Sequence, residues 1–343
     1  MSDPERILLV RPSALGDVCR TVPVLVSLRE RYPSARIDWL VQDTFVDAIV
    51  HHPALDGVVA FPRAALGRTS RRGNLLPSIR WMNEHLRPRG GYDLVVDAQG
   101  LFRSGLFTWW TRAGRRIGDA NARESAGVFY TERHAVAPDL HTVDRMLRLL
   151  EMGGIEPVRD MRLHADPRET AWVDEHLGNA CALLAPTSRW AAKQWPDERF
   201  TEVARELLGR GLAERVVLVG GPGERAQTRA LCALAELDER VTDLIGETSI
   251  ARLMAIVSRA RLVVANDSAT LHMGVGFDRP CVALYGPTDV DLVGPYARET
   301  DVIQHLRPGD TLDHKDARQV SLMQRISPVE VLAACEERLL PRA

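Results

Sequence analysis

Eight short aliphatic runs, separated by longer amphipathic stretches, constrain the fold of this chain more than any other feature. The runs lie at Ile7–Val10, Ile37–Val41, Val58–Phe61, Leu94–Val96, Ala182–Ala185, Val216–Val219, Leu262–Ala265 and Val282–Tyr285. Helix-like patterns between them include Arg199–Leu208, Ala226–Leu237 and Ile250–Val257. Runs that are apolar throughout are typical of strands buried on both faces, as in parallel α/β sheets. We therefore expect an α/β fold of doubly wound parallel sheets.

The length of the chain predicts two domains. A single core rarely grows beyond about 250–300 residues, and the chain has 343. The stretch Gly153–Pro167 combines glycine, proline and charged residues and is the best candidate linker. We expect one domain over residues 1–155, a second over 168–325, and a last amphipathic helix within 326–343.

The composition indicates a globular protein of the cytoplasm. Hydrophobic residues make up 45% and charged residues 26%, and the net charge of −2 gives no reason to expect a nucleic-acid partner. No apolar run approaches the roughly 20 residues that span a bilayer, and the start shows no signal-peptide pattern. The five cysteines form no CxxC pair, which fits a reducing compartment and argues against a zinc cluster.

Polar residues follow several of the predicted strands, where open α/β sheets bind their ligands. They are Asp17 after the first run, Asp97-Ala-Gln-Gly100 after the fourth, Thr187-Ser188 after the fifth, Glu224 after the sixth and Asn266-Asp267-Ser268 after the seventh. Because the carboxyl ends of parallel strands share one edge of a sheet, we expect these side chains to mark ligand-binding edges.

Each of the clearest candidates also has a purely structural interpretation. Asp267 stands where a helix should start, so free N–H groups there can bind an anion such as pyrophosphate; alternatively, Asp267 is a plain N-cap. His272, one turn later, faces the same ligand or is an ordinary buried imidazole. Lys193 can pair with a phosphate, or it is a surface lysine on a loop. Asp17 can serve as a catalytic carboxylate, as an N-cap, or as both, and Pro23 interrupts the helix that follows.

Three further motifs carry weaker signals. Gly221–Ala226 satisfies the dinucleotide fingerprint G-x-G-x-x-A, which by itself is weak evidence for a nicotinamide enzyme. Asp289–Asp291 has the D-x-D spacing of some metal-dependent sugar transferases but follows a strand directly, which favours a loop role. Residues 102–116 mix aromatic residues with four arginines. One interpretation is that this stretch docks on an anionic membrane surface. The interpretation we favour is an amphipathic helix that buries Phe107 and Trp110 in its own domain.

Five motifs, taken in order, resemble those of glycosyltransferase family 9, the ADP-heptose:lipopolysaccharide heptosyltransferases. They are RPSALGDVCRTVPVL, YDLVVDAQGLFRS, PTSRWAAKQWP, NDSATLHMGVGFDRPCVALYGPTD and MQRISPVEVL. The resemblance covers residues 7 to about 335, and the stretch 92–134 most resembles heptosyltransferase I. It implies the GT-B fold, in which two Rossmann-like domains face each other across a cleft and the last helix packs back on the first domain. It also implies an inverting, metal-independent transfer, with the acceptor bound by the first domain and the nucleotide sugar by the second.

The same resemblance implies roles for residues of this chain. Asp17 matches the catalytic base, which takes the proton of the acceptor hydroxyl, and Lys193 matches a residue that stabilises the departing diphosphate. The implied donor-binding positions are Thr187, Ser188, Lys193, Glu224, Asp267, Ser268, Ala269 and His272. The implied acceptor-binding positions are Ser13, Gly16, Arg63, Arg103 and Arg123. A guanidinium group at such a position would pair with the carboxylate of an acidic sugar.

We therefore expect a glycosyltransferase that moves heptose, or a similar sugar, from ADP to an acidic lipid-linked acceptor such as Kdo-lipid A. It would need no metal or cofactor and would contact the inner membrane peripherally. Ala269 stands where the family has glycine and Val290 where proline is usual, so the sugar and the acceptor stay open. The alternatives are a family member with another sugar and acceptor, a GT-B nucleotide-sugar epimerase, a relative that only binds, and a nicotinamide dehydrogenase.

Overall fold

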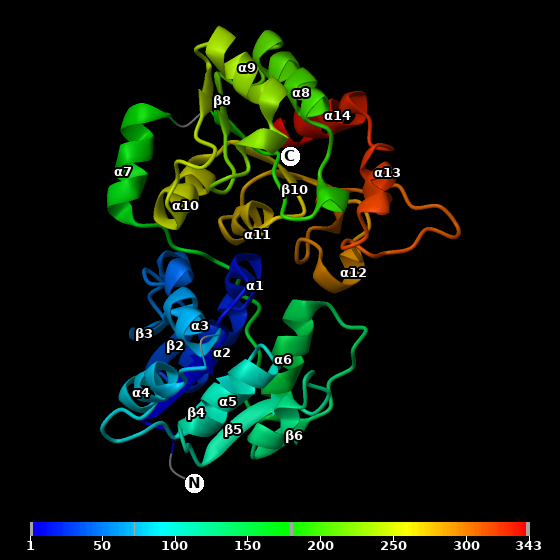
Figure 1. Ribbon diagram of the computed structural model, residues 1–343. Helices are drawn as coiled ribbons and strands as arrows, with labels where there is room; N and C mark the ends of the chain where they lie inside the picture. Colours follow the sequence, from blue (N-terminus) through cyan, green and yellow to red (C-terminus); the bar gives the residue numbers. More distant parts are fainter. Residues whose placement is uncertain (1–2, 72, 179–180, 341–343) are drawn as a thin grey trace. The chain divides into compact units, whose positions relative to one another are not determined.

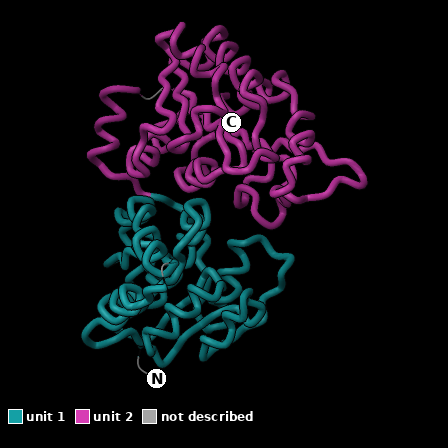
Figure 2. The backbone as a smooth tube through the Cα atoms, in the orientation of Figure 1, with its two compact units in different colours: residues 1–163 teal, residues 164–343 magenta. Residues whose placement is uncertain are grey.

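The computed structural model describes residues 3–71, 73–178 and 181–340, which form two compact units. Unit 1 comprises residues 1–163 and unit 2 residues 164–343 (Figures 1 and 2). The division falls inside the stretch 153–167 in which the sequence analysis placed a linker. In each unit the described residues contain a six-stranded parallel sheet with helices between its strands.

The sheet of unit 1 has the order β3-β2-β1-β4-β5-β6, and each neighbouring pair is parallel. Its strands are β1 (Arg6–Val10), β2 (Arg36–Gln42), β3 (Gly57–Phe61), β4 (Leu94–Asp97), β5 (Arg115–Asp119) and β6 (Glu132–His134). The helices are α1 (Leu15–Arg20), α2 (Val22–Arg31), α3 (Arg63–Arg71), α4 (Leu76–His85), α5 (Phe102–Trp110) and α6 (Thr142–Met152), with the 3-10 helices η1 (Asp43–Ala48) and η2 (Ala126–Phe129). One core cluster joins Leu8 and Val10 of β1 to Trp81 of α4 and Phe107 of α5.

Unit 2 repeats this topology with the order β12-β11-β10-β7-β8-β9, again parallel throughout. Its strands are β7 (Cys181–Ala185), β8 (Arg215–Leu218), β9 (Val241–Asp243), β10 (Leu262–Asn266), β11 (Cys281–Leu284) and β12 (Val302–Ile303). The helices are α7 (Pro167–His176), α8 (Asp197–Gly209), α9 (Arg229–Leu237), α10 (Ile250–Arg259), α11 (Ala269–Gly276), α12 (Val290–Val293), α13 (Val320–Met323) and α14 (Pro328–Leu339), with η3 (Ala191–Lys193), η4 (Arg225–Gln227), η5 (Glu299–Asp301) and η6 (Ala317–Gln319). Among the described helices of both units, none combines the length and the apolar character that a membrane span requires.

The strand order places a ligand-binding edge in each unit. Counted along its own unit, each sheet has the order third, second, first, fourth, fifth, sixth, which is that of Rossmann-like domains. The order reverses beside β1 in unit 1 and beside β7 in unit 2, and ligands bind outside the carboxyl ends of the strands at such points. Asp17 follows β1 and Lys193 follows β7, so both lie at the favoured edge. The predicted α/β class with two doubly wound sheets is confirmed.

The last helix corrects one expectation from the sequence. We expected it to pack back on the first domain, but the buried face of α14 belongs to the core of unit 2. Val331, Leu332 and Cys335 are buried there in one cluster with Val264 of β10 and Leu284 of β11. Ser327 caps α14 by accepting a hydrogen bond from the N–H of Glu330. An apolar stripe on a terminal helix shows that the helix is buried, not against which sheet.

A second difference concerns the segment after β1. Pro23 does not interrupt one helix: α1 ends at Arg20 and α2 begins at Val22, so the proline occupies the first turn of α2. Its missing N–H costs nothing there, because the first N–H groups of a helix lack helical partners anyway. The break leaves α1 as a short helix that carries Asp17 at the end of β1.

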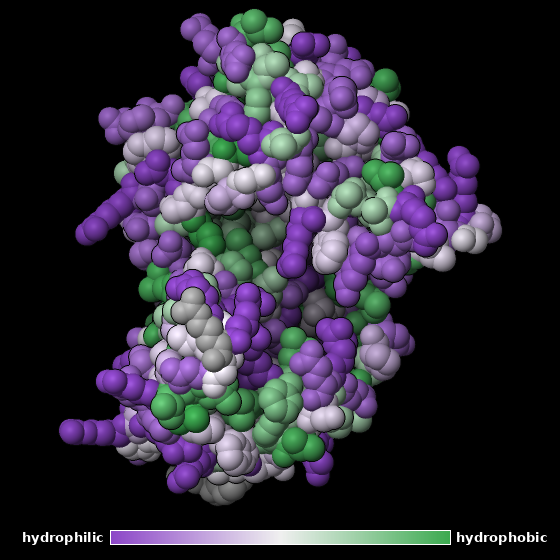
Figure 3. Space-filling model, viewed as in Figure 1, coloured by the Kyte–Doolittle hydropathy of each residue, from purple (hydrophilic) through white to green (hydrophobic). Residues whose placement is uncertain are grey.

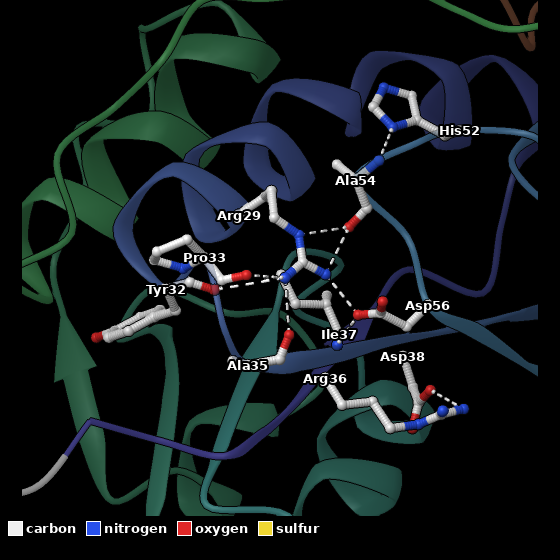
Figure 4. A network of polar contacts seen from close by, with 10 residues as sticks. All are labelled: Arg29, Tyr32, Pro33, Ala35, Arg36, Ile37, Asp38, His52, Ala54 and Asp56. Carbon is white, nitrogen blue, oxygen red and sulfur yellow. Dashed lines mark hydrogen bonds and ion pairs between the residues drawn. The ribbon is translucent and has the colours of Figure 1, made fainter.

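Arg29 organises the opposite end of the same sheet (Figure 4). Its guanidinium group donates to the carbonyl oxygens of Pro33 at 3.0 Å, Ala35 at 2.8 Å and Ala54 at 3.2 Å, and it contacts the carboxylate of Asp56. Asp56 in turn accepts from the N–H of Ile37 at 2.7 Å. The network joins the end of α2 to the loops that enter β2 and β3. It therefore stabilises the amino-terminal edge of the sheet and takes no part in the candidate site.

Candidate functional site

The turn after β1 holds Asp17 between two arginines. Asp17 Oδ1 accepts from Arg20 Nη2 at 2.5 Å, and Oδ2 lies 3.1 Å from Arg11 Nη2. Oδ2 also accepts from the N–H of Ala14 at 3.3 Å. Ala14 holds the N-cap position and Asp17 is the third residue of α1, so Asp17 is not the N-cap, although its carboxylate contributes to capping the helix. Both arginine side chains are buried, whereas that of Asp17 is 29% exposed. Gly16, an expected acceptor position, precedes it in α1.

These charges determine the protonation of Asp17. Burial would raise the pKa of its carboxyl group, but the positive charges of Arg11 and Arg20 hold the pKa well below the ordinary value. Asp17 is therefore ionised at neutral pH and able to act as a general base. The sequence analysis did not identify either arginine, although both lie in its first motif, RPSALGDVCR.

Asp97, at the end of β4, is a structural carboxyl group. It is 1% exposed and accepts from the N–H groups of Gln99 at 2.9 Å and Gly100 at 3.1 Å, and from the hydroxyl of Tyr130 at 2.7 Å. Burial raises the pKa of Asp97. The turn that it stabilises presents Gln99, whose Oε1 accepts from the N–H of Ser13 at 3.2 Å. Ser13, another expected acceptor position, is thereby held at the point where β1 and β4 end.

The three arginines expected to bind the acceptor follow β3, β4 and β5. Arg63 begins α3 and donates to Gln42 Oε1 at 3.3 Å, and the exposed Arg123 lies in the turn after β5. Arg103, the second residue of α5, lies over the ring of Phe61, 5.8 Å from its centroid. Partial burial and the neighbouring charge of Arg63 lower the pKa of Arg103. Two guanidinium groups that repel each other favour an anion between them.

In unit 2, Lys193 and Asp267 form an ion pair where β7 and β10 end. Lys193 Nζ lies 2.5 Å from Asp267 Oδ2, and the two side chains are 14% and 9% exposed. Burial would raise the pKa of Asp267, but the ammonium group of Lys193 holds it below the ordinary value. Both structural interpretations are therefore wrong. Lys193 is not a surface lysine, and Asp267 is not the N-cap of α11, because Ser268 occupies that position.

Asn266 holds this ion pair in place by joining two loops. Its Nδ2 donates to the carbonyl oxygen of Pro186 at 2.6 Å, and its Oδ1 accepts from the N–H of Trp195 at 3.2 Å. Asn266 and Trp195 are both buried. Lys193 precedes Trp195 by two residues and Asp267 directly follows Asn266, so these hydrogen bonds bring the ammonium and the carboxylate together.

The amino end of α11 has no side-chain cap. Ser268 makes no capping hydrogen bond, and in the described part of the chain its buried hydroxyl has no hydrogen-bond partner. The N–H groups of the first turn, beginning at Ala269, lack helical acceptors, and the helix dipole makes this end positive. Together with the ammonium group of Lys193, they form a suitable site for a diphosphate.

The other expected donor positions surround this helix end. Thr187 and Ser188 are buried directly after β7. Glu224 is half-buried after β8, and one of its oxygens accepts from the N–H of Gly221 at 2.6 Å. His272 lies one turn into α11, is 4% exposed, and its charge helps to lower the pKa of Asp267. The expected donor residues thus follow β7, β8 and β10 of one sheet.

Two of the three weaker motifs, Gly221–Ala226 and Asp289–Asp291, have local structural roles. The dinucleotide fingerprint requires a helix that starts at its glycines, but η4 intervenes after β8 and α9 begins only at Arg229. Asp289 caps α12 by accepting from the N–H of Asp291 at 3.1 Å. Within the described ranges, no group of three or more His, Cys, Asp or Glu side chains is placed to hold a metal ion.

His314 belongs to the surroundings of the ion pair and was missed in the sequence analysis. Its ring meets that of Trp190 edge-on, with centroids 5.8 Å apart, and Trp190 directly precedes η3, which ends at Lys193. Burial and the positive charge of Lys193 lower the pKa of His314, while Asp267 acts in the opposite sense. The segment RPGDTLDHKDARQ around it has no apolar periodicity and follows no predicted strand. Only tertiary packing of η6 and α13 against η3 brings it to the site.

Comparisons with known proteins agree with this arrangement. Residues 81–320 match the sequence model of glycosyltransferase family 9 (heptosyltransferase). Lipopolysaccharide heptosyltransferase 1 of Pseudomonas aeruginosa is 31% identical over 307 residues, which are 85% of this chain and 82% of that protein. Among solved structures, Escherichia coli ADP-heptose lipopolysaccharide heptosyltransferase II has a TM-score of 0.79 at 22% identity and covers 97% of this chain and 98% of its own. Escherichia coli heptosyltransferase WaaC with ADP-2-deoxy-2-fluoro heptose has a TM-score of 0.71 at 26% identity, with 93% and 99% covered.

Proposed function

Since the chain belongs to glycosyltransferase family 9, we propose that it moves heptose, or a similar sugar, from an ADP-sugar to an acidic lipid-linked acceptor of lipopolysaccharide core synthesis. The chain is a glycosyltransferase, and its relatives named lipopolysaccharide heptosyltransferase match most of its length. An ADP-sugar donor is supported by the similar protein that was solved with an ADP-linked fluoro-heptose. The fold and the positions of the site residues are compatible with this reaction.

The donor occupies the edge where β7 and β10 end. We assign the diphosphate to the amino end of α11, with Ser268 and Ala269 there and the ammonium group of Lys193 beside it. As the bond between the sugar C1 and the phosphate oxygen breaks, negative charge grows on the diphosphate. An oriented ammonium group and helix N–H groups stabilise that charge without having to reorganise. Thr187, Ser188 and His272 line the same pocket, and the free oxygen of Glu224 binds a ribose hydroxyl.

Asp17 acts as the base. The acceptor hydroxyl oxygen forms a bond to C1 on the face opposite the diphosphate, its proton passes to Asp17, and ADP leaves with the bonding electrons. A single displacement of this kind inverts the anomeric centre. Arg11 and Arg20 keep Asp17 ionised and fix its orientation, so the base is ready in every productive encounter. The proton transfer follows bond formation, because the acceptor hydroxyl becomes strongly acidic only as it attacks.

The acceptor binds at the edge of unit 1. Arg103 lies over the ring of Phe61, and Arg63 follows Phe61 by two residues, which supports an acidic sugar at this edge because guanidinium groups recognise carboxylates by paired hydrogen bonds. Arg123, Ser13 and Gly16 complete this side. We propose that the enzyme works without metal, in the cytoplasm and in peripheral contact with the inner membrane, since the acceptor carries a lipid.

The ion pair of Lys193 and Asp267 beside an uncapped helix end carries this proposal, because it builds a diphosphate pocket at the motif shared with the family. The test is to incubate purified protein with ADP-heptose and Kdo-lipid A, with and without EDTA, and to follow ADP release and the anomeric configuration of the product. We expect acceptor-dependent release, an inverted linkage and no effect of EDTA. A change in the nucleotide sugar without acceptor would instead identify an epimerase. Release abolished by EDTA would contradict metal independence.

A further inference from the structure

One face of unit 1 exposes large hydrophobic side chains from three neighbouring elements. Leu76 and Ile79 of α4 are 73% and 38% exposed, Phe102 and Trp109 of α5 are 49% and 48% exposed, and Val128 of η2 is 71% exposed. Figure 3 shows hydrophobic side chains gathered over α4 and α5. We call these five residues the α4–α5 patch.

The patch is not explained by the core of the unit. Phe107 of α5 is 4% exposed and packs edge-on against Phe61, with ring centroids 5.0 Å apart, so the core interpretation of α5 holds for this residue. Phe102 and Trp109 leave the same helix on its outer side, where about half of each side chain is exposed. The helix therefore has an outer apolar face in addition to the inner face that the core requires.

Ring and hydrogen-bond contacts join α5 to α4 on one side and to η2 on the other. Asn83 of α4 accepts from Trp110 Nε1 at 3.0 Å, and the rings of Trp110 and Trp109 are 5.9 Å apart. The ring of Phe129 lies 6.4 Å from that of Trp109 and 5.4 Å from that of Phe102. Isolated exposed hydrophobic residues need no explanation, but a contiguous surface indicates an interaction site.

A glycine makes this surface possible. A Cβ atom on Gly105 of α5 would lie 2.6 Å from the ring of Phe129 and 3.1 Å from the carbonyl oxygen of Ala126. Without that atom, η2 lies directly against α5. The close approach brings Phe129 and its neighbour Val128 to the same surface as the aromatic residues of α5.

Arginines flank both ends of α5. At its carboxyl end, Arg87 donates to the carbonyl oxygen of Trp110 at 2.9 Å and lies over the ring of Trp110, 5.1 Å from its centroid. Arg112 follows the last residue of the helix by two positions, and its N–H donates to the carbonyl oxygen of Trp109 at 3.1 Å. At its amino end, Arg103 lies over the ring of Phe61, and the acidic Glu124 accepts from the N–H of Phe102 at 3.1 Å. Aromatic side chains between basic groups match a membrane surface, where indole rings lie at the headgroup level and arginines bind lipid phosphates.

We propose that the α4–α5 patch docks unit 1 on an anionic membrane and thereby presents the lipid-linked acceptor to the arginines beside it. This inference rests on the proposed function for its acceptor, and sequence continuity supports it, since Phe102 of the patch directly precedes Arg103. A sugar held at Arg103 would leave its lipid beside the apolar face. Binding of the membrane and binding of the acceptor would then occur on one surface of the unit.

The test uses sedimentation with vesicles of phosphatidylethanolamine and phosphatidylglycerol, and with vesicles of phosphatidylcholine alone. The variants are Trp109→Ser/Val128→Ser, which removes apolar contact, and Arg112→Gln, which removes one charge. The matched control is Leu237→Ser, because Leu237 of α9 in unit 2 is 83% exposed and lies outside the patch. Turnover is measured with Kdo-lipid A in vesicles and with a deacylated, water-soluble form of the same acceptor.

We expect the full-length protein to bind anionic vesicles and the double variant to lose at least tenfold in affinity. Arg112→Gln should lose about fivefold, the effect of one basic residue near an anionic surface, and Leu237→Ser should lose nothing. Turnover on the soluble acceptor should stay unchanged in all variants, while the double variant loses turnover on vesicles. Equal binding by all variants, or equal loss in Leu237→Ser, would overturn the proposal. So would self-association of the unmodified protein that the double variant abolishes, because the patch would then be an interface between copies of the chain. Absence of turnover on either acceptor, with vesicle binding intact, would refute the proposed function instead.

Discussion

Replacing Lys193 by methionine tests the donor pocket most directly. The substitution keeps much of the unbranched stem but removes the ammonium group that lies 2.5 Å from Asp267. The chain provides its own control, because Lys193 and Lys315 are its only two lysines and Lys315 is exposed. Lys315→Met removes the same charge without touching the ion pair. Binding of ADP by each variant separates a local contact from a change in overall charge.

Two energetic contributions add up in the expected loss of affinity for ADP. A hydrogen bond to a charged group contributes about 1.5–3 kcal/mol, which is about 10- to 150-fold in the dissociation constant. Lys193→Met also leaves the carboxylate of Asp267, only 9% exposed, without its cation and next to the bound diphosphate. Two like unit charges 4 Å apart repel by about 4 kcal/mol at an effective dielectric constant of 20, an upper bound here. We therefore expect a loss near the upper end of the range.

The repulsion between Asp267 and the diphosphate predicts that a second substitution restores ADP affinity and that the affinity of Lys193→Met depends on pH. Lys193→Met/Asp267→Asn removes the orphaned charge, so the double variant should bind ADP more tightly than Lys193→Met alone. In Lys193→Met the main cause that lowers the pKa of Asp267 is gone, and burial then raises that pKa. The affinity of Lys193→Met for ADP should therefore improve as the pH falls and the carboxyl group of Asp267 becomes protonated.

Isothermal titration calorimetry with ADP measures all four proteins, and thermal melting confirms that each is folded. The reasoning is refuted if Lys193→Met binds ADP as tightly as the unmodified protein, or if Lys315→Met loses as much. If the double variant binds ADP no more tightly than Lys193→Met, repulsion by Asp267 does not contribute, and the loss comes only from the missing ammonium contact.

Four further predictions concern other parts of the molecule. Asp17→Asn should lower kcat by about 10²–10⁴-fold with ADP affinity unchanged. Because the pKa of Asp17 is depressed in the folded protein, its ionisation stabilises the fold fully above the unfolded pKa of about 3.9, and this stabilisation is lost as the pH falls through the folded pKa. The melting temperatures of the variant and the parent protein should therefore converge in acid. Arg20→Gln removes one of the causes that depress this pKa and should shift the acid limb of kcat/KM to higher pH; an unshifted limb would contradict the assignment. ADP binding should raise the lowered pKa of His314, so calorimetry at pH 6 in two buffers should detect proton uptake that His314→Ala abolishes. Gly105→Ala should push the ring of Phe129 from α5 and destabilise the protein by about 1–3 kcal/mol, and chemical denaturation that finds no loss would show that the contact relaxes freely.

The buried strands were predictable because their sequences are apolar throughout. All eight predicted runs coincide with strands within a residue or two at each end. The strands that were missed, β5, β6, β9 and β12, are short or charged. β5 carries Arg115 and Arg116, and Arg115 is accommodated by an ion pair with Glu132 on β6, an interaction across strands that local periodicity does not reveal.

In the candidate site, too, some residues could be predicted from the sequence and others could not. Motif positions such as Lys193 and Asp267 were identified because they directly follow strands, where topology alone brings polar groups to one edge. Their partners were not identified. Sequence spacing gives no sign that Asn266 ties the two loops, that Arg11 reaches Asp17, or that His314 approaches Lys193 from a distant segment. Arg20 follows Asp17 by three residues, a spacing at which helical side chains meet, so this one pair could have been recognised from the sequence. Pairing and protonation depend on contacts between segments, and these became visible only with the fold.

The two binding edges differ in how firmly their residues are held. At the proposed donor site the ion pair is buried and tied by hydrogen bonds on both loops, so little ordering would remain to be done if a diphosphate binds there. The arginines proposed to bind the acceptor are exposed, and Arg63 donates to a single neutral side chain, that of Gln42, at 3.3 Å. Long side chains of this kind lose rotamer freedom on binding, which offsets part of the attraction between charges. Tight acceptor binding therefore requires a further contribution, and an adjacent apolar face resting on the membrane would supply it by confining enzyme and acceptor to the same surface.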